Sequence, residues 1–208
     1  MTTDGREATA EAGGRFREMG TPPGTVQALL FDLDGTLVDT REANFLAYRD
    51  AFAEHGFELT AEQFATTWGR DSRYFIPDLL PGLGQEGVDA IRAAKSRLYA
   101  EQLHRTAGNE ALIAFLRLVA PTHRTALVST AKSGNGRQIL DTHGLTGLFD
   151  VVVWGDQVGR SKPDPEGYLR ALELLGADAA RSLAFEDSAT GRQAALAAGL
   201  TVLEVPAF

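Results

Sequence analysis

Cysteine is absent from the chain, so disulfide bonds, thiolate catalysis and cysteine-based zinc sites are excluded. Long apolar runs are also absent, because a stretch such as Ala111–Leu116 is much shorter than the about 20 residues that a spanning helix needs. The opening residues, MTTDGREATAEAGGRFREMG, lack the apolar segment of a secretory signal. We therefore expect a cytoplasmic protein that has no membrane partner.

Positive charge is in short supply, with 20 lysine and arginine residues against 28 aspartate and glutamate residues. The net charge of −8 would repel a phosphate backbone, so we expect no nucleic-acid partner. The composition is otherwise that of a globular protein, and 208 residues suffice for one core with a smaller inserted unit. Both a monomer and a homodimer are compatible with this composition.

Short apolar segments alternate with helical patterns in the second half of the chain. Asn109, Asp164 and Ser188 precede three of these patterns and are the residue types expected at helix N-caps. Strand–helix–strand alternation favours a parallel sheet with helices on both faces, so the expected fold class is α/β with a Rossmann-like core. The predicted strands are Val26–Phe31, Thr125–Ser129, Val151–Trp154, Ser182–Phe185 and Thr201–Val205.

The segment between Thr40 and Asn109 has a different character, because it contains no convincing strand. Two amphipathic helical patterns, EANFLAYRDAFAEHG and EGVDAIRAAKSRLYAEQLH, lie in it, and Thr60 with Gln63 forms the pattern of a capping box. We therefore expect three parts: a loose tail over residues 1–24, an α/β core over residues 25–40 and 109–208, and an all-helical insert over residues 41–108.

Polar residues with catalytic potential follow four of the predicted strands. The carboxyl ends of parallel strands meet at one edge of a sheet, where ligands of open α/β folds bind. We therefore expect these side chains to form one site. The set consists of Asp32 and Asp34 after the first strand, Ser129 and Thr130 at the end of the second, Lys162 after the third, and Glu186 and Asp187 after the fourth.

Four carboxylates gathered at one edge would repel each other unless a cation lay between them. Mg²⁺ prefers carboxylate oxygens, and together with a lysine and a hydroxyl it suits a phosphoryl group. The chain has no Gly-x-x-x-x-Gly-Lys-Ser/Thr stretch, so a nucleotide-binding P-loop is excluded. The residues therefore predict a magnesium site that handles a phosphoryl group.

Four short segments carry a resemblance to a known family. DLDGTLVD, VST, SKPDPE and FEDSATGRQAALAAG occur in the order of the four motifs of the haloacid dehalogenase-like hydrolases. The position of the insert, directly after the first motif, resembles the helical-cap subgroup that contains phosphoglycolate phosphatase and β-phosphoglucomutase. The resemblance implies a phosphoric monoester hydrolase that acts on a small phosphorylated substrate and uses Mg²⁺.

The resemblance also implies a role for each matching residue. Asp32 would be the nucleophile that forms an aspartyl-phosphate. Asp34 would be the general acid and base, with its backbone carbonyl on the metal. Ser129 and Lys162 would bind the transferring phosphoryl group. The implied metal ligands are Asp32, Asp34, Glu186 and Asp187.

Substrate contacts are expected from both the core and the insert. The resemblance places WGRDSRYFIPDLL at a substrate-specificity loop and KSRLY in a segment that meets the substrate. We predict that Trp68 and Trp154 serve packing. The predicted substrate contacts are Arg70, Arg73 and Lys95 in the insert and Thr130 and Lys132 in the core.

Two other functions stay open at the level of sequence. One is a sugar-phosphate mutase, which would keep the phosphoryl group and return it to the sugar. The resemblance argues against it, because such mutases carry a histidine at the position where this chain has Asn44. A non-catalytic binding module on the same scaffold is the other alternative. A phosphatase acting on a sugar phosphate or a similar metabolite is the preferred interpretation, because the catalytic set is complete.

Overall fold

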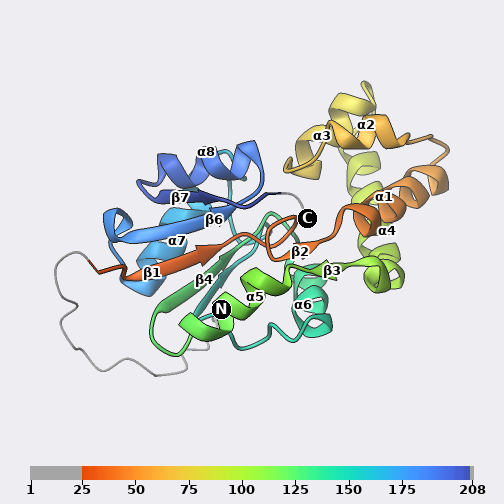
Figure 1. Ribbon diagram of the computed structural model, residues 1–208. Coiled ribbons are helices and arrows are strands. Elements are labelled where there is room, and N and C mark those ends of the chain that lie inside the picture. Colours follow the sequence, from red (N-terminus) through yellow and green to blue (C-terminus); the bar gives the residue numbers. More distant parts are fainter. Residues whose placement is uncertain (1–24, 207–208) are drawn as a thin grey trace, which may run out of the picture.

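The computed structural model describes residues 25–206, so the expected tail over residues 1–24 lies outside the described residues. Its centre is a five-stranded, fully parallel sheet (Figure 1) with the order β5-β4-β1-β6-β7. The strands are β1 (Ala28–Phe31), β4 (Arg124–Val128), β5 (Val151–Val153), β6 (Ser182–Glu186) and β7 (Thr201–Glu204).

Helices cover both faces of the sheet, as Figure 1 shows. Alternate residues of β1 point to opposite faces: Leu29 and Phe31 join one buried cluster, and Ala28 and Leu30 join the other. The first cluster includes residues of α5 (Glu110–Val119) and α6 (Ser133–Thr142), and the second includes residues of α7 (Glu166–Leu175) and α8 (Ala189–Ala197). The predicted α/β fold class is confirmed.

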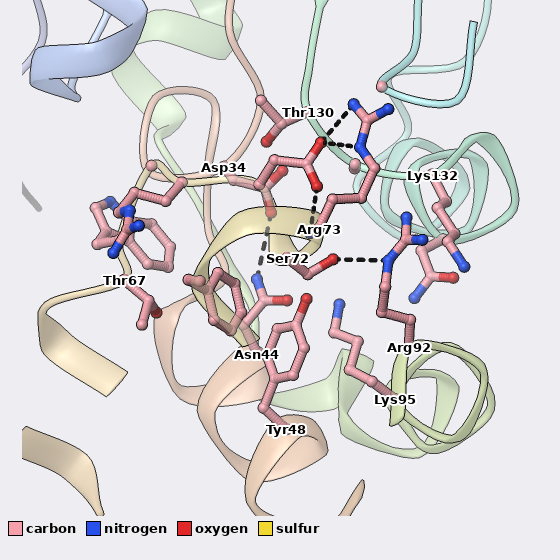
Figure 2. Close-up of a pocket in the computed structure, with 18 of the residues that line it drawn as sticks. Asp34, Asn44, Tyr48, Thr67, Ser72, Arg73, Arg92, Lys95, Thr130 and Lys132 are labelled. Carbon is pink, nitrogen blue, oxygen red and sulfur yellow. Dashed lines mark hydrogen bonds and ion pairs between the residues drawn. The ribbon is translucent and has the colours of Figure 1, made fainter. Parts of the chain in front are cut away.

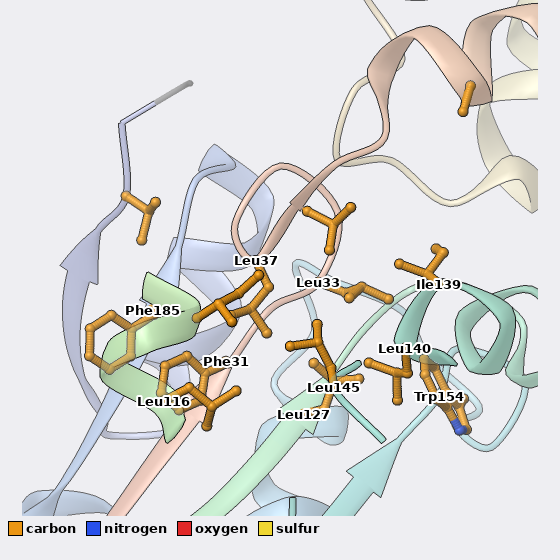
Figure 3. Close-up of a cluster of buried hydrophobic side chains, with 14 of the residues drawn as sticks. Phe31, Leu33, Leu37, Leu116, Leu127, Ile139, Leu140, Leu145, Trp154 and Phe185 are labelled. Carbon is orange, nitrogen blue, oxygen red and sulfur yellow. The ribbon is translucent and has the colours of Figure 1, made fainter. Parts of the chain in front are cut away.

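The first cluster holds several of the largest fully buried side chains of the protein (Figure 3). Phe31 stacks on Phe185 with ring centroids 4.6 Å apart, and Leu127 and Leu116 are fully buried beside them. Full burial of such a side chain stabilises a fold by roughly 1.5–3 kcal/mol. The strand ends that carry the polar residues are therefore anchored in a fully buried part of the sheet.

A helical insert lies between two short strands, β2 (Val38–Asp39) and β3 (Ala107–Gly108). These strands pair antiparallel, so the chain leaves the core and returns to it at one place. The insert stands to one side of the sheet (Figure 1) and has its own buried cluster, with Ile76 and Ile91 fully buried. It comprises α1 (Arg41–Glu54), α2 (Ala61–Ala65), α3 (Ser72–Leu79), α4 (Gln85–Gln102) and the 3₁₀ turn η1 (Leu103–Arg105).

The predicted helix starts are mostly confirmed. Thr60 and Gln63 form the capping box of α2, and the side chains of Asn109 and Ser188 cap α5 and α8. The prediction for α7 is wrong by one residue, because Pro165 is the N-cap. The Asp164 carboxylate instead accepts a hydrogen bond from the Glu166 backbone N–H at 3.0 Å.

The elements that were not predicted include the short strands β2 and β3 and helix α3. The strand β3 is only two residues long and depends on pairing with β2, so no local pattern marks it. Helix α3 contains Pro77, which makes its sequence resemble a loop, but the Asp71 side chain caps its first turn. Over residues 25–206, no helix has the length and apolarity needed to cross a bilayer.

Candidate active site

The carboxyl ends of β1, β4 and β6 bring the predicted polar residues to one edge. Asp32 directly follows β1 and Ser129 directly follows β4, while Glu186 ends β6 and Asp187 follows it. Lys162 reaches the same place from the segment between β5 and α7. Four of these residues are buried: Asp32, Ser129, Lys162 and Glu186. The predicted site is therefore assembled at the predicted edge.

A buried lysine lies between two buried carboxylates. Lys162 Nζ is 2.6 Å from Asp32 Oδ1 and 2.6 Å from Glu186 Oε1, and it also donates to the Val128 carbonyl at 2.9 Å. Burial acts to lower the pKa of Lys162, but the charges of Asp32 and Glu186 outweigh burial and raise it. Lys162 is therefore a fixed positive charge beside Asp32.

Asp32 lies in a cluster with more negative than positive charge. Burial raises the pKa of Asp32, the Lys162 ammonium acts in the opposite sense, and Glu186 and Asp187 raise it further. One carboxylate oxygen from each of the three acids lies within 4.8 Å of the others. A divalent cation bound there would offset the excess negative charge, and this donor set of carboxylate oxygens fits a hard metal ion.

Glu186 has most of its hydrogen-bonding capacity filled by protein groups. Its Oε1 accepts from Lys162 and, at 2.5 Å, from the Tyr168 hydroxyl, while the Ser188 hydroxyl lies 3.4 Å from Oε2. The first turn of α8 packs closely on this carboxylate: a Cβ at Gly191 would be 2.0 Å from Oε2. This geometry makes Glu186 a group that holds Lys162 in place.

Asp34 is oriented by residues of the core and the insert. The Thr40 hydroxyl donates to Asp34 Oδ1 at 2.6 Å and the Asn44 amide lies 3.4 Å from the same oxygen. The Ser129 hydroxyl lies 3.3 Å from Oδ2. Figure 2 shows Asn44 pointing at Asp34 from α1. A carboxylate held in this way, and facing a cavity, can exchange a proton with a bound ligand.

Asp187 accepts hydrogen bonds on both oxygens. The Thr36 hydroxyl donates to Oδ1 at 3.1 Å, and the Trp68 indole donates to Oδ2 at 3.0 Å. The turn after β1 must stay very close to this carboxylate. A Cβ at Gly35 would lie 2.3 Å from Asp187 Oδ2, and Gly35 has a φ of 89°, so glycine is required there on both counts.

A cavity of about 340 Å³ opens above these residues, between the sheet edge and the insert. Asp32, Asp34 and Lys162 lie on its core side, as do Thr130 and Lys132. Figure 2 shows Thr130 near Asp34 and Lys132 at the other end of the pocket. The volume suits a small metabolite. The two predicted core contacts therefore line the same pocket as the predicted nucleophile.

The predicted insert contacts also line the pocket, but they differ in their partners. Arg70 is paired with Asp78, and Arg73 bonds Asp71 through Nε and Nη2 at 3.0 and 2.8 Å. Both arginine charges are thus largely matched within the insert itself.

Lys95 has a different environment. Its ammonium lies over the rings of Tyr99 and Tyr48, at 4.1 and 5.1 Å from their centroids. Burial lowers the pKa of Lys95 to about 8, and the nearby Asp34 acts in the opposite sense. No carboxylate among residues 25–206 forms an ion pair with it. Lys95 is therefore a partly buried cation of the pocket that is available to a ligand.

Several site residues were missed at the level of sequence. Trp68 packs against the buried cluster of the insert, as predicted, but it also lines the pocket and donates to Asp187, which the sequence did not indicate. Arg92 lines the pocket and donates to Ser72 at 3.1 Å (Figure 2). Tyr168, whose hydroxyl donates to Glu186, is also not among the predicted site residues. A WGR segment in an expected specificity loop was the available signal for Trp68, whereas Arg92 and Tyr168 sit in ordinary amphipathic helices.

Comparisons with known proteins agree on one family. The family model described as haloacid dehalogenase-like hydrolase matches residues 29–205. The phosphorylated carbohydrates phosphatase of Thermotoga maritima is 31% identical over 180 residues, which cover 84% of this chain and 82% of that protein. The protein CbbY of Rhodobacter capsulatus is 33% identical over 196 residues, which cover 87% of this chain and 86% of that protein.

Solved structures agree with the sequence relatives. CbbY from Rhodobacter sphaeroides in complex with phosphate has a TM-score of 0.79 at 27% identity, and the match covers 88% of each chain. The β-phosphoglucomutase of Clostridium difficile shares the fold, with a TM-score of 0.77 at 20% identity over 86% of this chain and 84% of that chain. The predictions of the family and of a hydrolase enzyme are confirmed: the chain belongs to the haloacid dehalogenase-like hydrolases.

Proposed function

We propose that the protein is a Mg²⁺-dependent phosphatase that hydrolyses a small phosphorylated metabolite, such as a sugar phosphate, through an aspartyl-phosphate on Asp32. One observation carries this proposal: Asp32 faces a metabolite-sized cavity, is held by Lys162 at 2.6 Å, and shares a cluster with two further acids. A nucleophile, a fixed cation and a metal-binding donor set are the parts that phosphoryl transfer requires.

In the first step, Lys162 holds Oδ1 of Asp32, which leaves Oδ2 to attack phosphorus. The new oxygen–phosphorus bond forms as the bond to the substrate oxygen breaks, and Asp34 gives that oxygen a proton. In the second step, Asp34 takes a proton from water as the water oxygen attacks phosphorus. Asp32 then leaves as a carboxylate and inorganic phosphate is released.

Ser129 and Lys162 orient and neutralise the phosphoryl oxygens, and Thr130 and Lys132 extend this binding surface. The acids that would hold Mg²⁺ are Asp32, Glu186 and Asp187, together with the Asp34 backbone carbonyl. When bound, the ion supplies positive charge that offsets both the carboxylates and the phosphoryl oxygens.

The helical insert, residues 41–108, acts as a cap over the core formed by residues 25–40 and 109–208. Its contribution of pocket residues from α1, α3 and α4 supports this role. The names of relatives support a carbohydrate-like substrate: one is a phosphorylated carbohydrates phosphatase and another is a validoxylamine A 7′-phosphate phosphatase. Lys95, with its free charge, is the cap residue best placed to meet the substrate; Arg70 and Arg73 would first have to leave their own acids.

The test is an assay of the full chain against a panel of phosphorylated sugars, glycolate phosphate, nucleotides and an aryl phosphate. Each compound is run with Mg²⁺ and with a chelator, and free phosphate and isomer formation are followed together. Phosphate release that requires Mg²⁺ and disappears in Asp32→Asn is the expected result.

The same assay separates the alternatives. Isomer formation with little free phosphate would contradict the proposal and favour a mutase. Such a mutase would work without the histidine that its relatives carry at the position of Asn44. Equal behaviour of the wild type and Asp32→Asn with every compound would favour a binding module.

A further inference from the structure

Two insert residues with no role in the proposed chemistry contact Asp187. The indole Nε1 of Trp68 donates to Asp187 Oδ2 at 3.0 Å, and the Arg41 guanidinium is 3.7 Å from the same oxygen. Arg41 also lies over the Trp68 ring, 5.1 Å from its centroid. Together with the hydroxyl of Thr36 on Oδ1, these groups leave the Asp187 side chain only 4% exposed.

This contact joins the insert to the core. Trp68 lies between α2 and α3, whereas Asp187 follows β6 in the sheet. The next residue strengthens the junction, because the Thr190 hydroxyl donates to the Gly69 carbonyl at 2.7 Å. A Cβ at Gly69 would be 2.8 Å from the Ser188 side chain, so the insert backbone rests directly on the start of α8. The junction is therefore a close-packed surface with two defined hydrogen bonds.

The chemistry of the two donors differs in a way that suits a metal ligand. An indole N–H is neutral, so Trp68 can fix Oδ2 without adding a positive charge that competes with a cation. A carboxylate oxygen has two lone pairs, and each oxygen of Asp187 keeps capacity after accepting one hydrogen bond. Arg41 is 41% exposed and 3.7 Å away, so solvent screens most of its interaction.

We propose that Trp68 is a positioning residue that orients Asp187 for the metal only while the insert lies against the sheet edge. Metal binding and cap closure then strengthen each other, because each favours the same arrangement of Asp187. This inference rests on the proposed function, in which Asp187 holds Mg²⁺. Coupling of this kind is reciprocal: a ligand that closes the cap must tighten Mg²⁺ binding by the same factor by which Mg²⁺ tightens that ligand.

The test is calorimetric titration of the full chain with Mg²⁺, with and without saturating inorganic phosphate as the ligand that closes the cap. Trp68→Phe keeps an aromatic ring and removes the N–H. We expect it to bind Mg²⁺ about tenfold more weakly, the usual scale for losing a group that orients a metal ligand. We also expect phosphate to tighten Mg²⁺ binding less in the variant than in the wild type.

Two further variants control this titration. Arg97→Gln changes an exposed cap ion pair with Glu54 that does not line the pocket, and should bind Mg²⁺ like the wild type. Thr190→Val removes the second junction hydrogen bond but leaves Trp68 intact. It should weaken Mg²⁺ binding in the same direction as Trp68→Phe, and it tests the coupling independently if Trp68→Phe folds poorly.

Fluorescence gives a readout that does not depend on activity. The chain has 2 tryptophans, so Trp154→Phe leaves Trp68 as the single reporter. Its emission should change when Mg²⁺ is added and change further with phosphate.

Mg²⁺ affinity within twofold of the wild type in both Trp68→Phe and Thr190→Val would overturn the inference. Asp187→Asn separates this from a failure of the proposed function. Lost Mg²⁺ binding in Asp187→Asn alone would keep the metal site and reject the coupling, whereas wild-type binding in Asp187→Asn would reject the metal site itself.

Discussion

Lys162 and Tyr168 converge on a single oxygen of Glu186, and this pair of contacts fixes the charge beside the nucleophile. The Tyr168 hydroxyl donates at 2.5 Å and its ring lies 5.3 Å from the Lys162 ammonium. Burial raises the pKa of Tyr168 well above its ordinary value, and the charge of Glu186 raises it further. The hydroxyl therefore stays protonated and serves as a permanent donor to Glu186.

We predict that Tyr168→Phe lowers the free energy of unfolding by about 1–3 kcal/mol, because a buried carboxylate loses a donor. Glu186, which holds Lys162, is then less firmly positioned, so kcat should fall several-fold while KM changes little. Chemical denaturation and steady-state kinetics measure the two effects. Tyr74→Phe is the matched control, since Tyr74 is 52% exposed, and it should change stability by less than about 0.5 kcal/mol. An unchanged kcat in Tyr168→Phe would contradict this role.

At the scale of elements, the turn from β6 into α8 is the part of the fold that shapes the acidic cluster. The strand ends on Glu186, the Ser188 side chain accepts from the Gly191 backbone N–H, and the helix begins at once. The helix can approach the carboxylate this closely only because its first turn has a residue without a side chain. The first turn of α8 therefore has two roles: Ser188 caps the helix, and Gly191 lets the helix pack against Glu186.

We predict that Gly191→Ala destabilises the protein and lowers activity at least tenfold, because the new methyl group would overlap the buried carboxylate of Glu186. Gly134→Ala is the control in another helix, α6, where a Cβ meets nothing within 4 Å. It should raise stability by up to about 1 kcal/mol, since alanine favours helix more than glycine does. Thermal unfolding of both variants checks the opposite signs; two equal shifts would contradict the packing argument.

Features that depend on neighbouring residues could be predicted from the sequence, whereas features that depend on distant contacts could not. Local patterns specify α5 and α8, because Asn109 and Ser188 use their own side chains to cap them. They also indicate the edge at which Asp32 and Lys162 meet, because parallel strands share a direction. They do not indicate β3 or the Trp68–Asp187 bond. Both depend on contacts between segments far apart in the chain, and no residue nearby in sequence reports them.

At the scale of the whole molecule, the pocket between core and insert holds a partly buried charge, that of Lys95, which affects stability. Burial lowers the pKa of Lys95 to about 8, against 10.5 for an ordinary lysine. Between these pH values the unfolded chain binds more protons than the folded one, so stability rises with pH. Below about pH 8 both states carry the charge, and the full cost of burying it remains.

Lys95→Met should therefore be more stable than the wild type below pH 8. We expect a difference of roughly 2 kcal/mol, because the two tyrosine rings offset part of the desolvation cost. The difference should shrink as the pH rises from about 8 to 10.5. Urea denaturation over this range measures it, with Arg97→Gln as the exposed control that should show no such trend. A difference that is constant with pH would contradict the burial of a charged Lys95.

The most direct test of the whole account is to identify the residue that carries the phosphoryl group during turnover. The full chain would be mixed with Mg²⁺ and an aryl phosphate, quenched with acid before completion, and mapped by peptide mass spectrometry. We predict a phosphoryl group on Asp32 that is absent from Asp32→Asn and from the sample with chelator. Turnover of the same compound with no phosphoryl group on Asp32, or with one on Asp34 instead, would contradict the account.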